Sequence, residues 1–453
     1  MIPNNRKEII AKMLGELGLK DVKELYSDVP QTLLLDRPPD IGKSMSQADV
    51  SNVFEREVLG RILDVNLIFT GGGIADHYVP ALVDELSSRQ EFYTSYTPYQ
   101  PEVSQGVLQA LFEYQSLMAE LLGMDVVNAS LYDYASALGE AGRFSIRVTK
   151  RNKIVLASTI HPERYSVLKT YVEPLGTELV SIPYDESGEL SLEDLSSVVD
   201  ESVAMVYVES PNFFGIIETR IEEISQLCHD KGALLAVGVD PLSLGLVKPP
   251  GEMGADIVIG EGQHLGGYMN YGGPSLGIFA IKRRFRHIRQ MPGRLIGITR
   301  TVDGKFRGYS MVLQTREQHI RQEEATSNIT TNSSLMAIRA AIYLSLLGPD
   351  GIRKVSEKIF YNTLYLKRKI NELPCFKTLF PGSISFKEIP VIADKSWEDI
   401  NKFLLSKGIL GGFIIGSRFP ELDSEKKIAL FSTTEVHTKK DLDYLIQSMR
   451  EVC

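Results

Sequence analysis

The sequence lacks the features that mark several common classes of protein. Its three cysteines, Cys228, Cys375 and Cys453, match no metal-binding spacing. No stretch reaches the roughly 18 consecutive apolar residues of a membrane-spanning helix. The net charge of −9 does not favour nucleic acid or an anionic membrane surface. We therefore expect no metal, nucleic-acid or membrane partner, and reduced cysteines in the cytoplasm.

Catalytic signatures of fixed spacing are also missing. The sequence contains no HExxH, no CxxC pair and no Walker sequence, which leaves metal hydrolysis and phosphoryl transfer without the residues they need. The glycine-rich segment 69–80, "FTGGGIADHYVP", allows a ligand or a partner chain to approach its backbone closely. His77 within it is a candidate site residue. The alternative is a loop closed by turn glycines.

What the sequence does contain is an alternation of strands and helices. Short β-branched runs such as "KIVLAST", "VAMVYVES" and "ALLAVGVD" are separated by helical patterns, which favours a mainly parallel sheet covered on both faces. After residue 335, two long helical patterns precede short strands such as "KEIPVIA". We predict an α/β protein with a large domain at 61–335 and a smaller α/β domain at 336–453. Residues 1–60, interrupted by prolines, read as a helical segment that wraps a neighbouring surface.

The stretch 251–277, "GEMGADIVIGEGQHLGGYMNYGGPSLG", has the pattern of a pyridoxal-phosphate site without its lysine. Gln263 and His264 stand where such enzymes place a His-Lys pair. Lys248 precedes a surface-like turn and Lys282 begins a cationic run, so neither suits a Schiff base. Asp240 closes an apolar strand, where an acid would pair with the cofactor's ring nitrogen. The alternatives are a turn cap for Asp240 and a structural hydrogen bond for His264.

Residues 93–106, "YTSYTPYQPEVSQG", present tyrosines on a run stiffened by prolines. Tyr96, Tyr99 and Gln100 are candidates for a polar pocket or an interface, because rigid exposed tyrosines lose little entropy on binding. The alternative is a tyrosine-rich packing corner.

Residues 292–335 interleave arginines with threonine and asparagine. Arginine binds carboxylates and phosphates through two parallel hydrogen bonds, so this segment, with Arg294, Arg300, Arg316 and Arg321, is a candidate anion-binding segment. A solvated arginine-rich loop is the alternative.

Four motifs together resemble a known family. "GGGIADHYVP", "YTPYQPEVSQG", "PPGEMGADIVIGEGQ" and "PGRLIGITRTVDGK" followed by "TREQHIR" and "EATSNI" are similar to the glycine decarboxylase P-protein of the glycine cleavage system. The resemblance covers essentially the whole chain. Within the family it points to subunit 1, the amino-terminal half of enzymes that are split into two chains.

The resemblance implies an aminotransferase-like, fold type I pyridoxal-phosphate architecture. It further implies a heterotetramer with two copies each of subunit 1 and subunit 2, in which subunit 2 carries the lysine and pyridoxal phosphate. The implied reaction is decarboxylation of glycine, with transfer of its aminomethyl group to the lipoyl arm of the H protein. The residues His77, Tyr96, Tyr99 and Gln100 would then lie near the pocket, and Arg316, Thr326 and Asn328 at the interface or the glycine carboxylate.

Two other functions remain open from the sequence alone. A self-sufficient pyridoxal-phosphate transferase or desulfurase would use an unrecognised lysine and would be coloured when expressed alone. A purely structural scaffold would only stabilise its partner, and it cannot be told from a lysine-less subunit by sequence.

Overall fold

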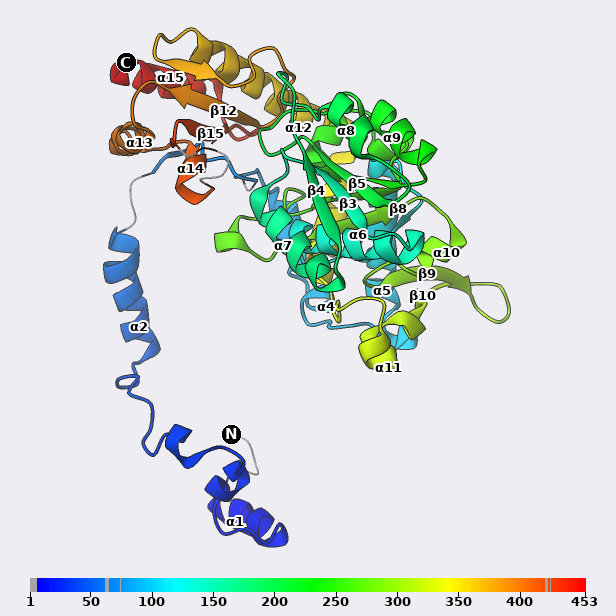
Figure 1. Cartoon of the computed structure of the whole chain (residues 1–453). Helices are drawn as coiled ribbons and strands as arrows, with labels where there is room; N and C mark the ends of the chain where they lie inside the picture. Colours follow the sequence, from blue (N-terminus) through cyan, green and yellow to red (C-terminus); the bar gives the residue numbers. More distant parts are fainter. Residues whose placement is uncertain (1–5, 62–64, 74, 420–422, 424) are drawn as a thin grey trace. The chain divides into compact units, whose positions relative to one another are not determined.

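A computed structural model describes residues 6–61, 65–73, 75–419, 423 and 425–453 (Figure 1). Contacts divide the chain into two units, Met1–Leu63 and Asp64–Cys453. The N-terminal unit consists of short helices: α1 (Lys7–Glu16), η2 (Val22–Tyr26), η3 (Gln31–Leu33), α2 (Gln47–Val53), η4 (Phe54–Val58) and η5 (Leu59–Arg61).

The N-terminal unit has almost no core of its own. In residues 6–60, Leu14 is the single buried side chain. Large apolar side chains are exposed along the whole unit, among them Leu17, Leu33, Ile41 and Phe54. Burial of apolar surface is the main force that folds small units, so this segment needs a surface to pack against.

The second unit is built on a seven-stranded sheet with the order β2-β8-β7-β6-β5-β3-β4. Strands β4, β3, β5, β6 and β7 pair in parallel, while β8 runs antiparallel to both of its neighbours. The strands are β2 (Val126–Val127), β3 (Lys153–Ala157), β4 (Glu178–Ile182), β5 (Val203–Ser210), β6 (Leu234–Val239), β7 (Ile257–Glu261) and β8 (Gly277–Ile281).

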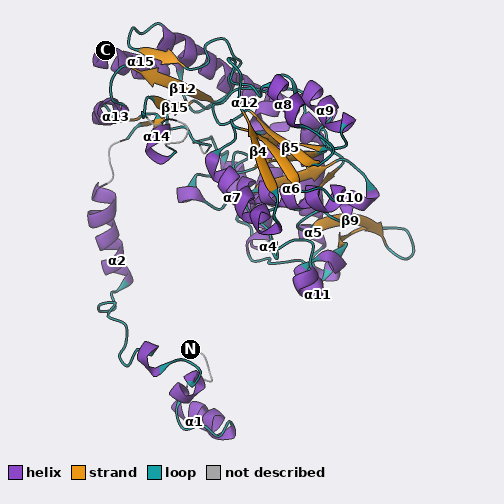
Figure 2. Cartoon of the chain, viewed as in Figure 1, coloured by secondary structure: helices purple, strands orange, loops and turns teal. Residues whose placement is uncertain are grey.

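Helices cover this sheet, as its composition requires (Figure 2). All residues of the parallel strands β5, β6 and β7 are buried, as expected of parallel strands covered on both faces, and those of antiparallel β8 are buried too. The parallel pairing of β4, β3, β5, β6 and β7 confirms the predicted mainly parallel sheet. The surrounding helices are α3 (Ala81–Ser87), α4 (Gln90–Tyr93), α5 (Gln105–Leu122), α6 (Tyr134–Thr149), α7 (Pro162–Val172), α8 (Leu192–Val198), α9 (Ile221–Asp230), α10 (Phe285–Ile288) and α11 (Gln318–Arg321).

A smaller antiparallel sheet follows in the order β11-β12-β15-β14. Trp397 and Phe431 lie in its core with ring centroids 5.6 Å apart. A hairpin of β9 and β10 and a short parallel pair of β1 and β13 complete the strands. The bounds are β1 (Leu67–Ile68), β9 (Leu295–Arg300), β10 (Arg307–Val312), β11 (Phe376–Thr378), β12 (Glu388–Ala393), β13 (Ile409–Leu410), β14 (Phe413–Ile414), β15 (Ile428–Ser432), α13 (Trp397–Ser406), α14 (Ile415–Arg418) and α15 (Lys439–Val452).

Helix α12 (Ser334–Asn371) runs between the two cores. It is broken at Gly348, whose φ of 59° is left-handed, immediately before Pro349. Ala337 lies in the large core and Leu366 in the small one. Length and composition alone would also suit a membrane span, but such helices are common in globular cores. Helix α12 begins at Ser334 and crosses the domain boundary predicted at residue 335. The division of the chain at that residue therefore stays a prediction.

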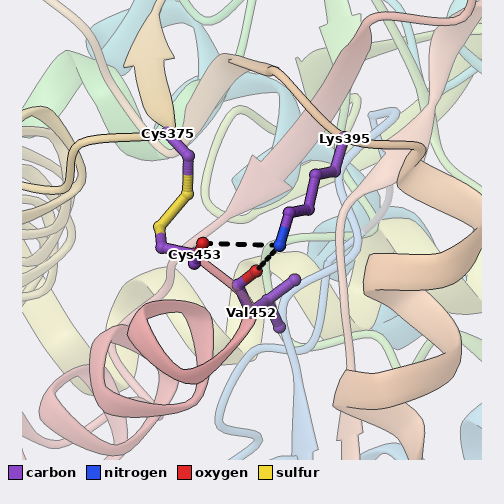
Figure 3. Close-up of a disulfide and its surroundings, with 4 residues drawn as sticks. All are labelled: Cys375, Lys395, Val452 and Cys453. Carbon is purple, nitrogen blue, oxygen red and sulfur yellow. Dashed lines mark hydrogen bonds between the residues drawn. A yellow bond between two sulfur atoms is a disulfide. The ribbon is translucent and has the colours of Figure 1, made fainter.

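A disulfide ties the end of the chain to the small sheet (Figure 3). Cys375, next to β11, is bonded to Cys453 with a Cα–Cα distance of 5.7 Å. Lys395 donates hydrogen bonds to the carbonyl oxygens of Val452 and Cys453. The expectation of reduced cysteines is therefore wrong for this pair, while Cys228 is a buried free thiol.

The disulfide is expected to stabilise the chain, because it closes a sequence separation of 78 residues. Replacing Cys453 by serine should lower the free energy of unfolding by roughly 2–4 kcal/mol. Guanidinium titration with and without dithiothreitol measures this. The reductant should lower the stability of the unaltered chain and leave the variant unchanged. An unaltered chain that does not respond to the reductant would contradict the prediction.

Candidate functional site

A buried ion pair lies at the carboxyl end of β6. Asp240 accepts the backbone N–H of Leu242 at 3.0 Å, so it is a turn cap. Its Oδ2 also pairs with Nζ of Lys387, and its Oδ1 lies 3.3 Å from Nδ1 of His264. Burial alone would raise the pKa of Asp240, but the ammonium of Lys387 and the ring of His264 hold that pKa well below its usual value. The strand-end carboxylate thus already has a cationic partner.

Lys387 reaches this strand end from the small sheet. It immediately precedes β12, and its backbone N–H donates to Oγ1 of Thr363 at 3.1 Å. The residue is 4% exposed and has a left-handed φ of 68°, which is unfavourable for a residue with a side chain. Its Nζ lies 3.3 Å from Nδ1 of His264. Contacts in the native fold must hold this conformation, and they include the pair with Asp240 and the backbone hydrogen bonds to Thr363 and Thr433.

The next residue, Glu388, binds the glycine-rich loop. Its Oε1 accepts the backbone N–H groups of Gly72 at 2.6 Å and Gly73 at 2.9 Å. Both glycines have left-handed φ values, 113° and 96°, so consecutive N–H groups can point at one oxygen. Burial raises the pKa of Glu388, and the two N–H groups act against that rise. The loop therefore approaches a carboxyl group of this same chain.

A second carboxyl group accepts a hydrogen bond from the first residue of helix α6. Glu261, the last residue of β7, accepts the backbone N–H of Tyr134 at 3.3 Å, of Gln263 at 2.9 Å and of Leu276 at 2.8 Å. Burial raises the pKa of Glu261 although these three donors oppose it. The free N–H groups at a helix start are a common phosphate-binding site. Here the Tyr134 N–H is taken by a side chain.

An arginine and a glutamate form another buried pair beside them. Nη1 of Arg164 lies 2.9 Å from Oε2 of Glu209, and its guanidinium lies 3.7 Å from the ring centroid of Tyr134. Burial alone would lower the pKa of Arg164, but Glu209 raises it above its usual value. Burial raises the pKa of Tyr134 as well. Arg164 is therefore charged and the phenol of Tyr134 neutral at pH 7.

Two histidines in this region are held neutral. Nδ1 of His77 lies 2.8 Å from Oε2 of Glu435, and the rings of His77 and His264 are 5.0 Å apart. Burial, with a smaller effect of Lys387, lowers the pKa of His77 to about 4. Burial and the neighbouring Arg164 lower the pKa of His161 to about 3. Both imidazoles therefore lie in the folded chain as uncharged groups at pH 7.

Little room remains between these side chains. The cavity that Asp240, His264 and Lys387 line measures about 40 Å³, against roughly 300–1,000 Å³ for typical small-molecule sites. A ring nitrogen beside Asp240 would have to displace Lys387, and a phosphate at the start of α6 would have to displace Glu261. The side chains of this strand-end site do not fit pyridoxal phosphate.

The position of the expected lysine is a buried turn. Gln263 and His264 follow β7, and Nε2 of Gln263 donates to the carbonyl of Gly267 at 2.7 Å. Lys248 lies in an exposed ion pair with Glu222. Lys282 donates to the carbonyl of Gly123, at the end of helix α5. The cavity's lysine is Lys387, whose ammonium is bound to Asp240.

The tyrosine segment lies on a different, exposed face. Tyr96 is 77% exposed and lines a hollow of about 350 Å³ together with Thr97 and Asn332. The hydroxyl of Tyr99 accepts a hydrogen bond from Nη2 of Arg294 at 3.1 Å. Gln100 is exposed. The chain thus presents phenol, hydroxyl and amide groups outward.

The arginine segment adjoins this face. Arg294 is buried and donates to the carbonyl of Thr330 at 2.6 Å, which joins the segment to Tyr99. Arg316 and Thr326 line a separate hollow of about 460 Å³. Asn328 is exposed and lies in the sequence between Thr326 of this hollow and Asn332 of the other one. Among the described residues there is no cluster of three or more histidine, cysteine or acidic side chains suited to a metal.

Comparison with known proteins identifies the family. A family model described as "Glycine cleavage system P-protein" matches residues 1–449. The chain belongs to this family. A P-protein relative from Staphylothermus marinus, named "Probable glycine dehydrogenase (decarboxylating) subunit 1", is 48% identical over 100% of this chain and 97% of its own length. A relative of the same name from Pyrococcus horikoshii is 46% identical over 100% and 99%.

Solved structures confirm the aminotransferase-like fold. A crystal structure titled glycine decarboxylase (P-protein) of the glycine cleavage system, in inhibitor-bound form, aligns with a TM-score of 0.88 and 38% identity over 100% of both chains. A NifS-like protein aligns with a TM-score of 0.62 and 15% identity over 85% of this chain and 98% of its own, which shows the fold alone.

Sequence reasoning missed most of the charged groups in this P-protein's strand-end site. Glu261 closes a buried strand just as Asp240 does, so the same pattern could have found it. Lys387 and Glu388 carry no such signal, because they come from the small sheet. Nothing local indicates that Arg164 stacks on Tyr134.

Proposed function

We propose that the chain is the lysine-less subunit of a two-chain glycine decarboxylase. With its partner it would decarboxylate glycine by means of pyridoxal phosphate, release CO2 and transfer the aminomethyl group to the lipoyl arm of the H protein. The full-length P-protein match and the name "subunit 1" of its relatives support this. A first subunit implies a second, for which we propose two copies of each chain in a cytoplasmic heterotetramer.

The ion pair between Asp240 and Lys387 is the main reason to assign the cofactor to the partner chain and not to this one. It neutralises the carboxylate that a cofactor's ring nitrogen would need, and Gln263 and His264 leave the usual lysine position without an amine. We therefore assign the cofactor and the Schiff-base lysine to the partner chain. This chain then acts through what it presents to that partner.

The exposed tyrosine face suits that role. We propose that Tyr96, Tyr99 and Gln100 complete the partner's active site, and that Arg316, Thr326 and Asn328 serve the interface or the glycine carboxylate. His77 does not belong to this exposed face, because it is buried beside His264. For the N-terminal unit, with its exposed apolar side chains, we propose that it packs on the partner chain.

Replacing Tyr96 by phenylalanine, or Gln100 by alanine, should lower glycine decarboxylation by the two-chain enzyme by about tenfold, because each removes a hydrogen-bonding group from the pocket. The measurement is glycine-dependent CO2 release with lipoylated H protein. Co-elution in size-exclusion chromatography should show that the complex stays assembled.

The control is Tyr93→Phe, because Tyr93 is 68% exposed and is not among the residues that we assign to the partner's active site. It should retain normal turnover. Normal turnover in all three variants would remove Tyr96 and Gln100 from the site and would favour a subunit that only stabilises its partner.

A further inference from the structure

Four arginines converge on one hollow of the large unit. The hollow has a volume of about 460 Å³ and is lined by Arg147, Arg289, Arg316 and Arg321 together with Thr326. This volume lies within the range of small-molecule sites. In a chain with a net charge of −9, such a concentration of positive charge needs an explanation.

The backbone around the hollow is held in place independently of any ligand. Leu313 has a left-handed φ of 56°, which turns the chain out of β10. Nη1 of Arg316 donates to the carbonyl of Met291, and the backbone N–H of Thr326 donates to the carbonyl of Arg316 at 3.1 Å. Arg147 is fixed by two bonds to Gln290, at 3.2 and 2.9 Å. The guanidinium groups are therefore positioned in advance.

Several of their donors have no partner within the described chain. These are Nε and Nη2 of Arg316 and Nη1 of Arg147, all buried. A buried charged donor without an acceptor is strongly unfavourable in a folded protein. Burial lowers the pKa of Arg316 to about 10 although Glu317 opposes this, and burial lowers the pKa of Arg147 to about 10 although Glu140 opposes it. The positive charges of Arg316 and Arg147 are therefore not fully balanced by neighbouring negative groups.

The acidic groups nearby compensate these cations only in part. Glu324, which lines the hollow, pairs with Arg321 at 3.1 Å. Glu317 lies 3.6 Å from Arg294, and Glu140 accepts a hydrogen bond from Ser327 at 2.8 Å. Both also act on the cations, since Glu317 opposes the fall in the pKa of Arg316 and Glu140 opposes that of Arg147. Among the described residues that line the hollow, four arginines stand against one glutamate.

We propose that this arginine pocket binds a phosphate group, with Arg316 and Arg147 as its principal donors. Guanidinium groups bind oxyanions through parallel hydrogen bonds, and the several oxygens of a phosphate match several unpartnered donors better than a single carboxylate does. The pocket is a different hollow from the filled strand-end site. Its assignment to phosphate is an alternative to the interface or glycine-carboxylate role proposed for Arg316 and Thr326, and it does not depend on the rest of the proposed function. The ligand is a free phosphate or a phosphate monoester.

The test is calorimetric titration of the full chain with inorganic phosphate, in a buffer of constant ionic strength set with sodium chloride. We expect one saturable site per chain. Arg316→Gln should weaken binding about tenfold or more, Arg316→Lys should weaken it less, and Arg147→Gln should also weaken it. The control is Arg300→Gln, because Arg300 is exposed on the β9–β10 hairpin and lies outside the hollow.

Circular dichroism shows whether each variant is folded. If a variant is not folded, Arg321→Gln takes its place in the titration, because Arg321 is more exposed. The proposal is overturned if phosphate gives no binding beyond that of chloride, or if the pocket variants bind as tightly as Arg300→Gln. It is also overturned if the complex with subunit 2 excludes phosphate, because the pocket would then receive acidic side chains of the partner.

Discussion

Replacing Lys387 by methionine is expected to destabilise the chain by about 3–5 kcal/mol, because it leaves the carboxylate of Asp240 buried without its cation. Lys387 is 4% exposed, so water cannot readily take its place. Methionine keeps a side chain of similar length and removes the charge. The free energy of unfolding, from urea titration of the full chain at pH 7, measures the loss.

Two further variants separate this effect from a general loss of packing. Lys387→Met combined with Asp240→Asn should recover most of the stability, because the unpaired charge is then gone. Lys439→Met should cost far less than Lys387→Met, since Lys439 forms an exposed ion pair with Asp443 on one helix face. Equal losses in Lys387→Met and Lys439→Met would show that the buried pair does not stabilise the site.

The second large effect is a loss of stability in mild acid. Burial first, with Lys387 adding to it, lowers the pKa of His77 to about 4, and burial with Arg164 lowers the pKa of His161 to about 3. In an unfolded chain both values are about 6.5. The unfolded state therefore binds protons first, so the stabilising contribution is complete above pH 6.5 and is lost as the pH falls toward 4.

Each histidine should give a limiting slope of about 1.4 kcal/mol per pH unit, and the two together about 2.7 kcal/mol per pH unit, which is approached near pH 5, where the unfolded histidines are almost fully protonated. Urea titrations at pH 7, 6, 5.5 and 5 measure how the stability falls toward that slope. His77→Gln and His161→Gln should each make the fall clearly shallower, and Lys439→Met should leave it unchanged. A slope that is the same in all four proteins would contradict the assignment of neutral buried histidines.

The contribution of Asp240 belongs to a lower pH range. Although burial opposes it, the pKa of this carboxyl is held well below its usual value by Lys387 and His264. The stabilisation is therefore present above about pH 3.9, the value for an unfolded chain, and is lost as the pH falls through the lower folded value. Acid titration thus separates the histidines from the ion pair.

The parts of the fold that depend on local pattern could be predicted from the sequence. The fully buried strands β5 and β6 are visible as continuous apolar runs, and Asp240 stands out because it ends one of them. The missing lysine was equally visible, since Gln263 and His264 occupy a position fixed by a short motif.

The contents of the site depend on contacts between distant segments, for which the sequence has no local signal. Lys387 meets His264 across 123 residues, and its left-handed backbone has no signature in the sequence. The disulfide joins Cys375 and Cys453 across 78 residues, so cysteine spacing could not reveal it. The contact of Lys387 with His264 forms where the small sheet meets the large one, and the disulfide forms within the small-sheet part of the chain.

The central claim is that this chain is a lysine-less partner whose own site is filled by its own side chains. Borohydride reduction of the chain co-expressed with its subunit 2, followed by mass spectrometry of both chains, tests it most directly. The account predicts a pyridoxyl group on a lysine of subunit 2 and none on this chain. A pyridoxyl group on this chain, at Lys387 above all, would contradict it.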